Sequence, residues 1–336
     1  PENLHIGLVA IKPGTGEILA MYGGQDYLKY QFNAATQGIT SGGSSFKAFT
    51  LVAALEEGIP LSSVWNGDSP KVYDDGIGRP YVVNNYGGET WGNTTLLNAT
   101  IHSVNTVYVP LGIKAGVEKV VDVARRAGIP ESVEMVASPS VSLGSSSPHV
   151  IDLANAYATF ASQGIYAKPF IINEVQGPNK GILYQGRIQA QEVFRKDVIA
   201  DLTYALNQVT IKGTGAVVGA RLNRPAAGKT GTANDNASAW FNGYTPEVAA
   251  SVAFYRDNAT ESLNGIGGLN SVTGGSFPAR IWAEFVKGYL GKAPIQDFPP
   301  AANIGGTEPI NFINAVPEMD PALIPPSPTP TPKKKK

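Results

Sequence analysis

Two groups of segments have the alternating apolar and polar pattern of β-strands. Residues 6–12 and 17–22 are joined by Pro13-Gly14-Thr15-Gly16, a turn sequence that predicts a β-hairpin. Three further runs come late in the chain, with turn residues between them, at 226–233, 238–244 and 248–255. Connections this short suit consecutive antiparallel strands. The pattern therefore predicts a central antiparallel sheet.

Apolar residues at helical spacing fill much of the remaining chain. The run after Ser44 consists of helix-forming residues and ends at Gly58. Between 94 and 164 the pattern is helical throughout, which predicts an all-α lobe. Helices are expected there at 95–101, 106–115, 117–127 and 149–161, and beyond it at 192–212 and 279–286. Pro110 leaves the start of the helix expected at 106–115 undetermined, because proline fits a helix best in its first turn. Together these elements predict an α+β fold with helices covering the sheet and a cleft beside the α lobe.

Three other segments lack a strong periodic pattern. Residues 60–93 are loop-rich and predict an excursion over the surface, and residues 166–187 predict short strands. We expect residues 1–298 to form one domain. Residues 299–336 are rich in proline and end in four lysines, a composition typical of an extended, disordered tail.

Composition narrows the possible functions. The net charge of the chain is −1, but without the four terminal lysines the remaining residues hold 22 Lys and Arg against 27 Asp and Glu. This body is too acidic for a nucleic-acid-binding domain. The chain has no cysteine, which excludes thiolate metal sites, disulfides and a cysteine nucleophile. We expect no metal and no cofactor.

Ser44 and Lys47 form the first candidate catalytic pair. Residues three apart on a helix share one face, so the serine hydroxyl and the lysine amine can reach the same pocket. A neutral lysine can take a proton from serine if burial or a second cation lowers its pKa. Ser-x-x-Lys is nevertheless weak evidence alone, since a chain of this composition contains about one by chance.

Two more motifs follow in order, Ser103-Val104-Asn105 between helices of the α lobe and Lys229-Thr230-Gly231-Thr232 on the first late strand. With the Ser-x-x-Lys pair, they make the chain resemble the penicillin-binding proteins, and more narrowly the transpeptidase domain of the bifunctional class A group. The resemblance extends over residues 1 to about 290. Its most specific blocks are Phe32-Asn33-Ala34-Ala35-Thr36-Gln37 and Ala239-Trp240-Phe241-Asn242-Gly243-Tyr244-Thr245-Pro246.

The resemblance implies a penicillin-binding, serine β-lactamase-like fold and an acyl-transfer reaction. Ser44 would be the nucleophile, Lys47 its base, and Ser103 the group that passes a proton to the leaving nitrogen. The oxyanion hole would consist of the backbone N–H groups of Ser44 and Thr232.

The other motif residues would bind the substrate, a peptide ending in D-Ala-D-Ala. Asn105 would hold its amide and orient Lys47. In the strand motif, Lys229 would pair with the terminal carboxylate, Thr230 and Thr232 would offer hydroxyls, and Gly231 lies between them.

The expected activity is that of a serine D,D-transpeptidase that cross-links peptidoglycan stem peptides and is acylated by β-lactams. The expected location is the extracytoplasmic face of a bacterial membrane, with an upstream glycosyltransferase and membrane anchor and possible cell-wall assembly partners. A D,D-carboxypeptidase and a β-lactam sensor that transfers nothing remain alternatives. Fast β-lactam hydrolysis is disfavoured, because no Glu between the second and third motifs stands in a Glu-x-x-x-Asn pattern.

Three positions depart from the family pattern. Gly42 and Ala48 stand where prolines are usual, which predicts a looser approach to the serine helix. Ser238 replaces the usual Asp ahead of Ala-Trp-Phe, and we expect a polar contact to be lost there.

Overall fold

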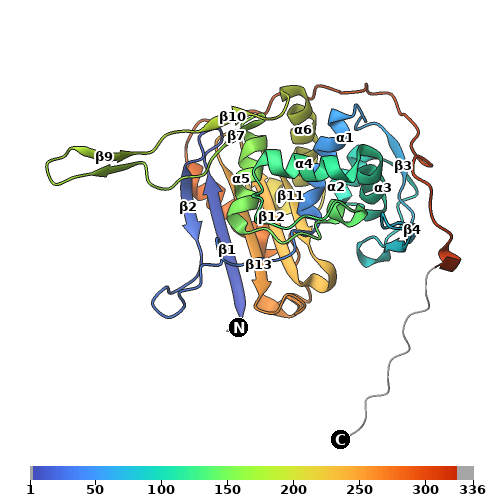
Figure 1. Ribbon diagram of the computed structural model, residues 1–336, viewed down its shortest axis with the longest axis horizontal. Coiled ribbons are helices and arrows are strands. Elements are labelled where there is room, and N and C mark those ends of the chain that lie inside the picture. The colour runs from blue at the N-terminus through green and yellow to red at the C-terminus, as the bar shows by residue number, and fades with distance from the viewer. Residues whose placement is uncertain (1–2, 324–336) are drawn as a thin grey trace, which may run out of the picture.

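A five-stranded antiparallel sheet forms the centre of the computed structural model, which describes residues 3–323 (Figure 1). Its strands lie in the order β11-β12-β13-β1-β2. Their bounds are β1 (Leu4–Ile11), β2 (Ile18–Tyr22), β11 (Ala227–Thr232), β12 (Ser238–Tyr244) and β13 (Ala249–Arg256). The early hairpin and the three late strands are therefore confirmed. They join through β1 and β13, which pair from Leu4↔Arg256 to Ile11↔Ala249.

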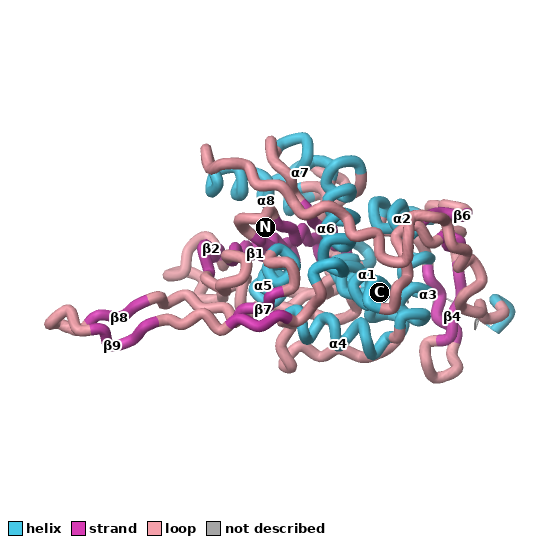
Figure 2. The backbone as a smooth tube through the Cα atoms, turned by 90° about the horizontal axis from the view of Figure 1, so that it is seen from above, coloured by secondary structure: helices cyan, strands magenta, loops and turns pink. Residues whose placement is uncertain are grey.

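Helices cover both faces of this sheet (Figure 2). One face packs against α5 (Val150–Ala161) and α6 (Lys196–Lys212), and the other against α7 (Ala216–Arg221) and α8 (Phe277–Leu290). Because strand side chains alternate, Val9 and Leu8 enter different hydrophobic cores. The predicted α+β class, with a central antiparallel sheet covered by helices, is confirmed.

Beside the sheet lie α1 (Lys47–Glu56), α2 (Leu96–His102), α3 (Asn105–Ala115) and α4 (Val117–Ala127). The α lobe expected at 94–164 is thus made by α2 to α4 with α1, whereas α5 packs on the sheet. Pro110 lies inside α3 rather than in its first turn. One continuous hydrophobic core joins this group of helices to the sheet.

Residues 60–93 are rich in loops, as expected, but they also contain strands that form two small ladders. Strand β3 (Val64–Asn66) pairs with β6 (Asn93–Thr95), and β4 (Lys71–Asp74) pairs with β5 (Pro80–Val83). Trp65 is only 2% exposed, which anchors this segment, called here the excursion, against the helices.

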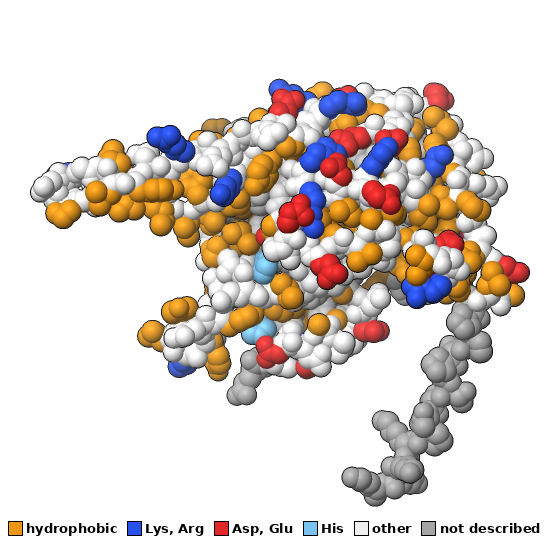
Figure 3. All heavy atoms as spheres, in the orientation of Figure 1, with side chains coloured by type: hydrophobic (Ala, Val, Ile, Leu, Met, Phe, Trp, Pro, Cys, Tyr) orange, Lys and Arg blue, Asp and Glu red, His pale blue; other side chains and the backbone are white. Residues whose placement is uncertain are grey.

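A long hairpin, called here the arm, projects from the body (Figures 1 and 2). At its root β7 (Ile165–Ala167) pairs with β10 (Ala190–Glu192), and farther out β8 (Glu174–Gln176) pairs with β9 (Ile182–Gln185). Hydrophobic side chains line the arm in the space-filling view (Figure 3). Helix α6 begins at Lys196 and not at residue 192, because Glu192 is paired with Ile165.

The segment 299–320, called here the strap, is extended but is held against the domain, which corrects the expectation of a disordered tail for this part of it. The Asp201 carboxylate accepts the backbone N–H groups of Ala302, Asn303 and Ile304 at 2.7, 2.9 and 2.7 Å. Farther along, the Phe312 ring stacks on Trp65 with centroids 5.1 Å apart. The terminal lysines lie outside the described residues.

Short 3-10 turns complete the described chain: η1 (Gly43–Phe46), η2 (Tyr86–Gly88), η3 (Pro139–Leu143), η4 (Asn234–Asn236), η5 (Ile266–Gly268) and η6 (Pro321–Leu323). Among residues 3–323, none of the helices combines the length and the hydropathy needed to cross a bilayer.

Candidate active site

Ser44 lies on η1, directly before α1, where the backbone is closely packed. Gly43 has φ +52°, and a Cβ added there would lie 2.9 Å from the carbonyl oxygen of Thr232. Only glycine fits both the left-handed conformation and this close approach. The turn therefore brings the Ser44 backbone beside the end of β11.

The residue after Ser44 holds this turn in place. Asn242 on β12 donates a 2.7 Å hydrogen bond from Nδ2 to Ser45 Oγ, and the Tyr157 hydroxyl donates to the Ser45 carbonyl at 2.9 Å. Ser45, Asn242 and Tyr157 are all fully buried. Ser44 itself is only half-buried, in contrast to Ser45.

Lys47 is fully buried and contacts the second motif. Its Nζ donates to the Ser103 carbonyl at 2.5 Å, to Ser103 Oγ at 3.0 Å and to Asn105 Oδ1 at 2.6 Å. Three acceptors match the three N–H groups of an ammonium. A neutral Lys47 has one donor fewer, and only the Ser103 hydroxyl can reverse its hydrogen bond, because the other two oxygens can only accept.

Ser103 connects the two lysines. It follows the last residue of α2 in the left-handed conformation, with φ 60° and ψ 41°. This conformation ends α2 and turns the chain into α3. Ser103 Oγ lies 3.0 Å from Lys47 Nζ and 2.8 Å from Lys229 Nζ, so one hydroxyl bridges the first and third motifs.

The third motif occupies the edge strand of the sheet. Ala233 N donates to Ser238 O, and the register pairs Gly231 with Trp240 and Lys229 with Asn242. Because hydrogen-bonding direction alternates along an antiparallel strand, the backbone amides of Thr230 and Thr232 face the open edge of β11. Glycine is required between them, since a Cβ at Gly231 would lie 2.5 Å from Ser45 Oγ.

The two threonine hydroxyls have different surroundings. Thr230 is buried, and its Oγ1 lies 2.7 Å from Thr214 Oγ1. Thr232 is half-buried, and its Oγ1 accepts the N–H of Gly274 at 3.2 Å, which leaves its own proton available to a ligand. Of the two, Thr232 is therefore better placed to donate to a bound anion.

Burial makes both lysines weaker bases than free lysine. The pKa of Lys47 lies well below its ordinary value, first because burial disfavours the charge and second because of the charge on Lys229. Burial lowers the pKa of Lys229 to about 7. As long as Lys229 is charged, its repulsion favours the neutral form of Lys47.

The penicillin-binding protein transpeptidase domain, as a family model, matches residues 6–271 of the chain. The chain belongs to this family. Penicillin-binding protein 1A of Aquifex aeolicus is 31% identical over 315 residues, which cover 93% of this chain and 42% of that protein. The predicted resemblance to the class A penicillin-binding proteins is confirmed, and the chain spans about two-fifths of the length of such relatives.

Solved penicillin-binding proteins have the same fold. PonA1 of Mycobacterium tuberculosis superposes with a TM-score of 0.80 at 31% identity, covering 94% of this chain and 85% of that one. A second structure of PonA1, in complex with penicillin V, gives a TM-score of 0.79 at 30% identity over 92% of this chain and 85% of that one.

Within this penicillin-binding fold, most of the predicted site residues lie together. Lys47, Ser103, Asn105 and Lys229 form one hydrogen-bonded cluster. One predicted contact is absent: within residues 3–323, no hydrogen bond joins the hydroxyl of Ser44 to the amine of Lys47. Lys47 is instead turned toward the α2–α3 connection.

The departures at Gly42 and Ser238 do not loosen the serine turn. Gly42 N donates to the Ser146 carbonyl at 2.9 Å, and Ser238 Oγ donates to the Ser41 carbonyl at 2.8 Å. Ser238 thus makes a polar contact of its own, in which its hydroxyl donates to a carbonyl, whereas an ionised Asp could only accept.

The sequence analysis missed four residues that support the site: Asn84, Asn85, Thr214 and Asn242. Asn84 and Asn85 lie in the loop-rich segment 60–93, where no sequence pattern distinguishes them. Asn242 falls within the specific block 239–246, and its polar side chain in a mainly apolar strand was a local signal for a buried hydrogen bond.

Proposed function

We propose that this transpeptidase domain is a serine D,D-transpeptidase that cross-links peptidoglycan stem peptides through an acyl-enzyme on Ser44. The observation that carries the proposal is the pair of buried lysines on opposite sides of the Ser103 hydroxyl, 3.0 and 2.8 Å away, next to the turn that bears Ser44. Such a pair supplies one neutral amine and one cation in the same site.

The donor peptide would bind along the open edge of β11. Lys229 pairs with the terminal carboxylate of the D-Ala-D-Ala donor, and Thr232 Oγ1 donates a hydrogen bond to it. Thr230 contributes through its backbone on the open edge, since its hydroxyl is paired with Thr214. Asn105 Nδ2 is bonded to the Asn84 carbonyl, so it would have to exchange that contact to bind the substrate amide.

Acylation begins when neutral Lys47 takes the hydroxyl proton of Ser44, after leaving its resting contact with Ser103. Ser44 Oγ then bonds to the carbonyl carbon of the scissile amide, and the backbone N–H groups of Ser44 and Thr232 stabilise the oxyanion. The C–N bond breaks as Ser103 donates its proton to the leaving D-alanine nitrogen. Lys47 returns a proton to Ser103, which restores both groups.

In the second half-reaction, the amine of another stem peptide attacks the ester carbonyl and loses its proton to Lys47. The bond from the carbonyl carbon to Ser44 Oγ then breaks as Lys47 passes that proton to Ser44 Oγ, which restores the free serine and the neutral lysine. A β-lactam enters the same path, but its leaving nitrogen remains tethered to the acyl group. The acyl-enzyme then persists, which makes β-lactams inhibitors. The penicillin V complex of PonA1, a relative of the same fold, supports this ligand class.

The test compares Ser44→Ala with Ser45→Ala by intact-protein mass after incubation with penicillin. Ser44→Ala should lose the adduct while its melting temperature is unchanged, and Ser45→Ala should still be acylated. An adduct on Ser44→Ala would place the nucleophile elsewhere.

A product assay with donor peptide and amine acceptor separates the alternatives. A transpeptidase forms the cross-linked product, whereas a carboxypeptidase releases D-alanine without it. A sensor on this fold would be acylated by penicillin and form neither product.

The proposed location is the extracytoplasmic face of a bacterial membrane, where peptidoglycan is assembled. The bacterial class A relatives support this location. The proposed partners are donor and acceptor stem peptides and β-lactams, with cell-wall assembly proteins as further candidates.

A further inference from the structure

The start of α3 is capped from a distant part of the chain. The residue before this helix, Val104, has no side chain that can cap it. Asn85 of the excursion serves instead, because its Oδ1 accepts the backbone N–H of Thr106 at 3.1 Å and lies 3.2 Å from Thr106 Oγ1. A carboxamide oxygen at this place satisfies a donor that a helix start otherwise leaves free.

The amide nitrogen of the Asn85 side chain also has hydrogen-bond partners. Its Nδ2 donates to the carbonyls of Gly67 at 3.1 Å and Glu89 at 2.9 Å. Asn85 is 5% exposed. Its orientation is therefore fixed, since exchanging oxygen and nitrogen would set an NH2 group against the Thr106 N–H.

The neighbouring residue completes the link to the catalytic lysine. The Asn84 carbonyl accepts Asn105 Nδ2 at 2.7 Å, which leaves Asn105 Oδ1 facing Lys47 Nζ at 2.6 Å. Two consecutive excursion residues thus hold two consecutive residues at the start of α3. The small ladders of the excursion lie beside α3 at the same end of the molecule (Figure 1).

We propose that Asn85 is a positioning residue for acylation: its carboxamide fixes the start of α3, so that Asn105 and Ser103 hold Lys47 in its buried place. Asn85 touches neither the substrate nor the reacting atoms. The inference rests on the proposed function, because it assigns a role in that reaction. The larger effect is expected on rate, since the carboxylate-binding groups lie on β11 and Asn105 is the one substrate-binding residue that Asn85 positions.

The experiment measures penicillin acylation of the full chain at several drug concentrations, which separates the first-order acylation constant from the noncovalent dissociation constant. Asn85→Leu removes every side-chain bond and should lower the acylation constant about 100-fold. The dissociation constant should change less than about threefold, since the groups that bind the carboxylate are untouched. Asn85→Asp keeps the cap acceptor at the helix start but sets its second carboxylate oxygen against the carbonyls of Gly67 and Glu89, so it should recover part of the rate that Asn85→Leu loses.

A matched control distinguishes positioning from general loss of stability. Thr159 is buried, and its Oγ1 donates to the Ala127 carbonyl at 2.8 Å, away from the lysine cluster. Thr159→Val should lower the melting temperature and leave the acylation constant unchanged. An equal loss of rate in Thr159→Val, or an unchanged rate in Asn85→Leu, would overturn the proposal.

Two further outcomes are also decisive. If Asn85→Leu does not fold, Asn85→Ser, which is too short to reach Thr106, takes its place with the same expected loss of rate. If the unmodified chain is not acylated at all, the proposed function fails first. Acylation of the unmodified chain together with unaffected Asn85 variants would reject only the role of Asn85.

Discussion

Lys229 Nζ lies 2.8 Å from the hydroxyl oxygen of Ser103, in a place where no solvent reaches the amine. Burial lowers the pKa of Lys229 to about 7, so this lysine loses its charge near neutral pH in the free protein. Burial also lowers the pKa of Lys47, and the charge on Lys229 adds to that decrease. A neutral Lys47 beside a charged Lys229 therefore requires a pH window in which Lys229 keeps its proton, below about 7.

This window predicts the pH dependence of acylation. The second-order rate constant for a carboxylate-bearing penicillin should fall as the pH rises through about 7, because Lys229 loses the charge that attracts the drug. Rapid-mixing measurements from pH 5 to 9 would test this. The methyl ester of the same penicillin should react slowly and without that fall, and a rate that rises to pH 9 for the acid would contradict the assignment.

Gly231→Ala should impair acylation far more than it impairs folding. The added Cβ would lie 2.5 Å from Ser45 Oγ and 2.7 Å from the Gly42 carbonyl, so the serine turn must move away from β11. We expect acylation to slow about 100-fold. Gly181→Ala is the control, because nothing lies within 4 Å of a Cβ at that position in the arm. Similar rates for the two variants would show that the close packing is unimportant.

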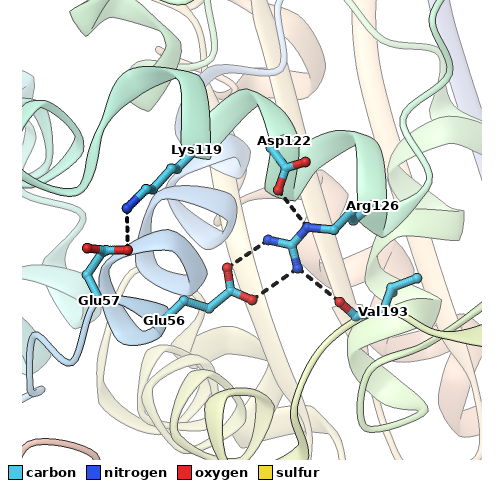
Figure 4. A network of polar contacts seen from close by, with 6 residues as sticks. All are labelled: Glu56, Glu57, Lys119, Asp122, Arg126 and Val193. Atoms are coloured by element: carbon cyan, nitrogen blue, oxygen red, sulfur yellow. Dashed lines mark hydrogen bonds and ion pairs between the residues drawn. The ribbon is translucent and has the colours of Figure 1, made fainter.

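Arg126 should contribute measurably to stability. Its guanidinium donates to both carboxylate oxygens of Glu56, at 3.0 and 2.7 Å, and also to Asp122 and to the Val193 carbonyl (Figure 4). Because this network is partly shielded from water, Arg126→Ala should lower the free energy of unfolding by about 1–3 kcal/mol. Denaturant unfolding of the variant would measure the loss.

The same figure shows the control, the more exposed ion pair between Lys119 and Glu57 (Figure 4). Lys119→Ala should cost about 0.5 kcal/mol or less, since solvent screens the pair. If the two variants lost equal stability, shielding would not be the cause.

Asp201→Ala should release the strap. The variant removes the acceptor of three backbone N–H groups in residues 302–304 and should cost about 3 kcal/mol. Limited proteolysis followed by mass measurement should then detect cleavage within 299–320. Glu308→Gln, an exposed change on the strap itself, should leave the strap protected. Cleavage at equal rates in both variants would mean that Asp201 does not anchor it.

The sequence correctly predicted those elements that are determined by residues close together along the chain. The hairpin of β1 and β2 follows from two apolar runs and the Pro13–Gly16 turn, and α1 follows from the apolar run after Ser44. The start of that helix was predicted too early, because Ser44 lies on the 3-10 turn η1 and α1 begins only at Lys47. The motif order also indicated which segments meet. Nothing in that order specified their geometry, such as the left-handed conformation of Ser103.

Features that depend on distant contacts were missed. The strap was expected to be disordered because its prolines form no element of their own, but Asp201 and Trp65 bind it from far along the chain. The role of Asn85 was equally hidden, since its partner Thr106 is 21 residues away. Contacts between residues so far apart leave no periodic pattern of apolar and polar positions in the sequence.

The open edge of β11 has a consequence for substrate selection. A peptide laid along this edge would be held through its own backbone amide groups, whose spacing is the same for every sequence, so this contact would not depend on its side chains. Discrimination would then fall on the chain end, where a free carboxylate must meet a cation. Stem peptides that differ in their inner residues could share one enzyme, whereas a donor with a blocked end could not.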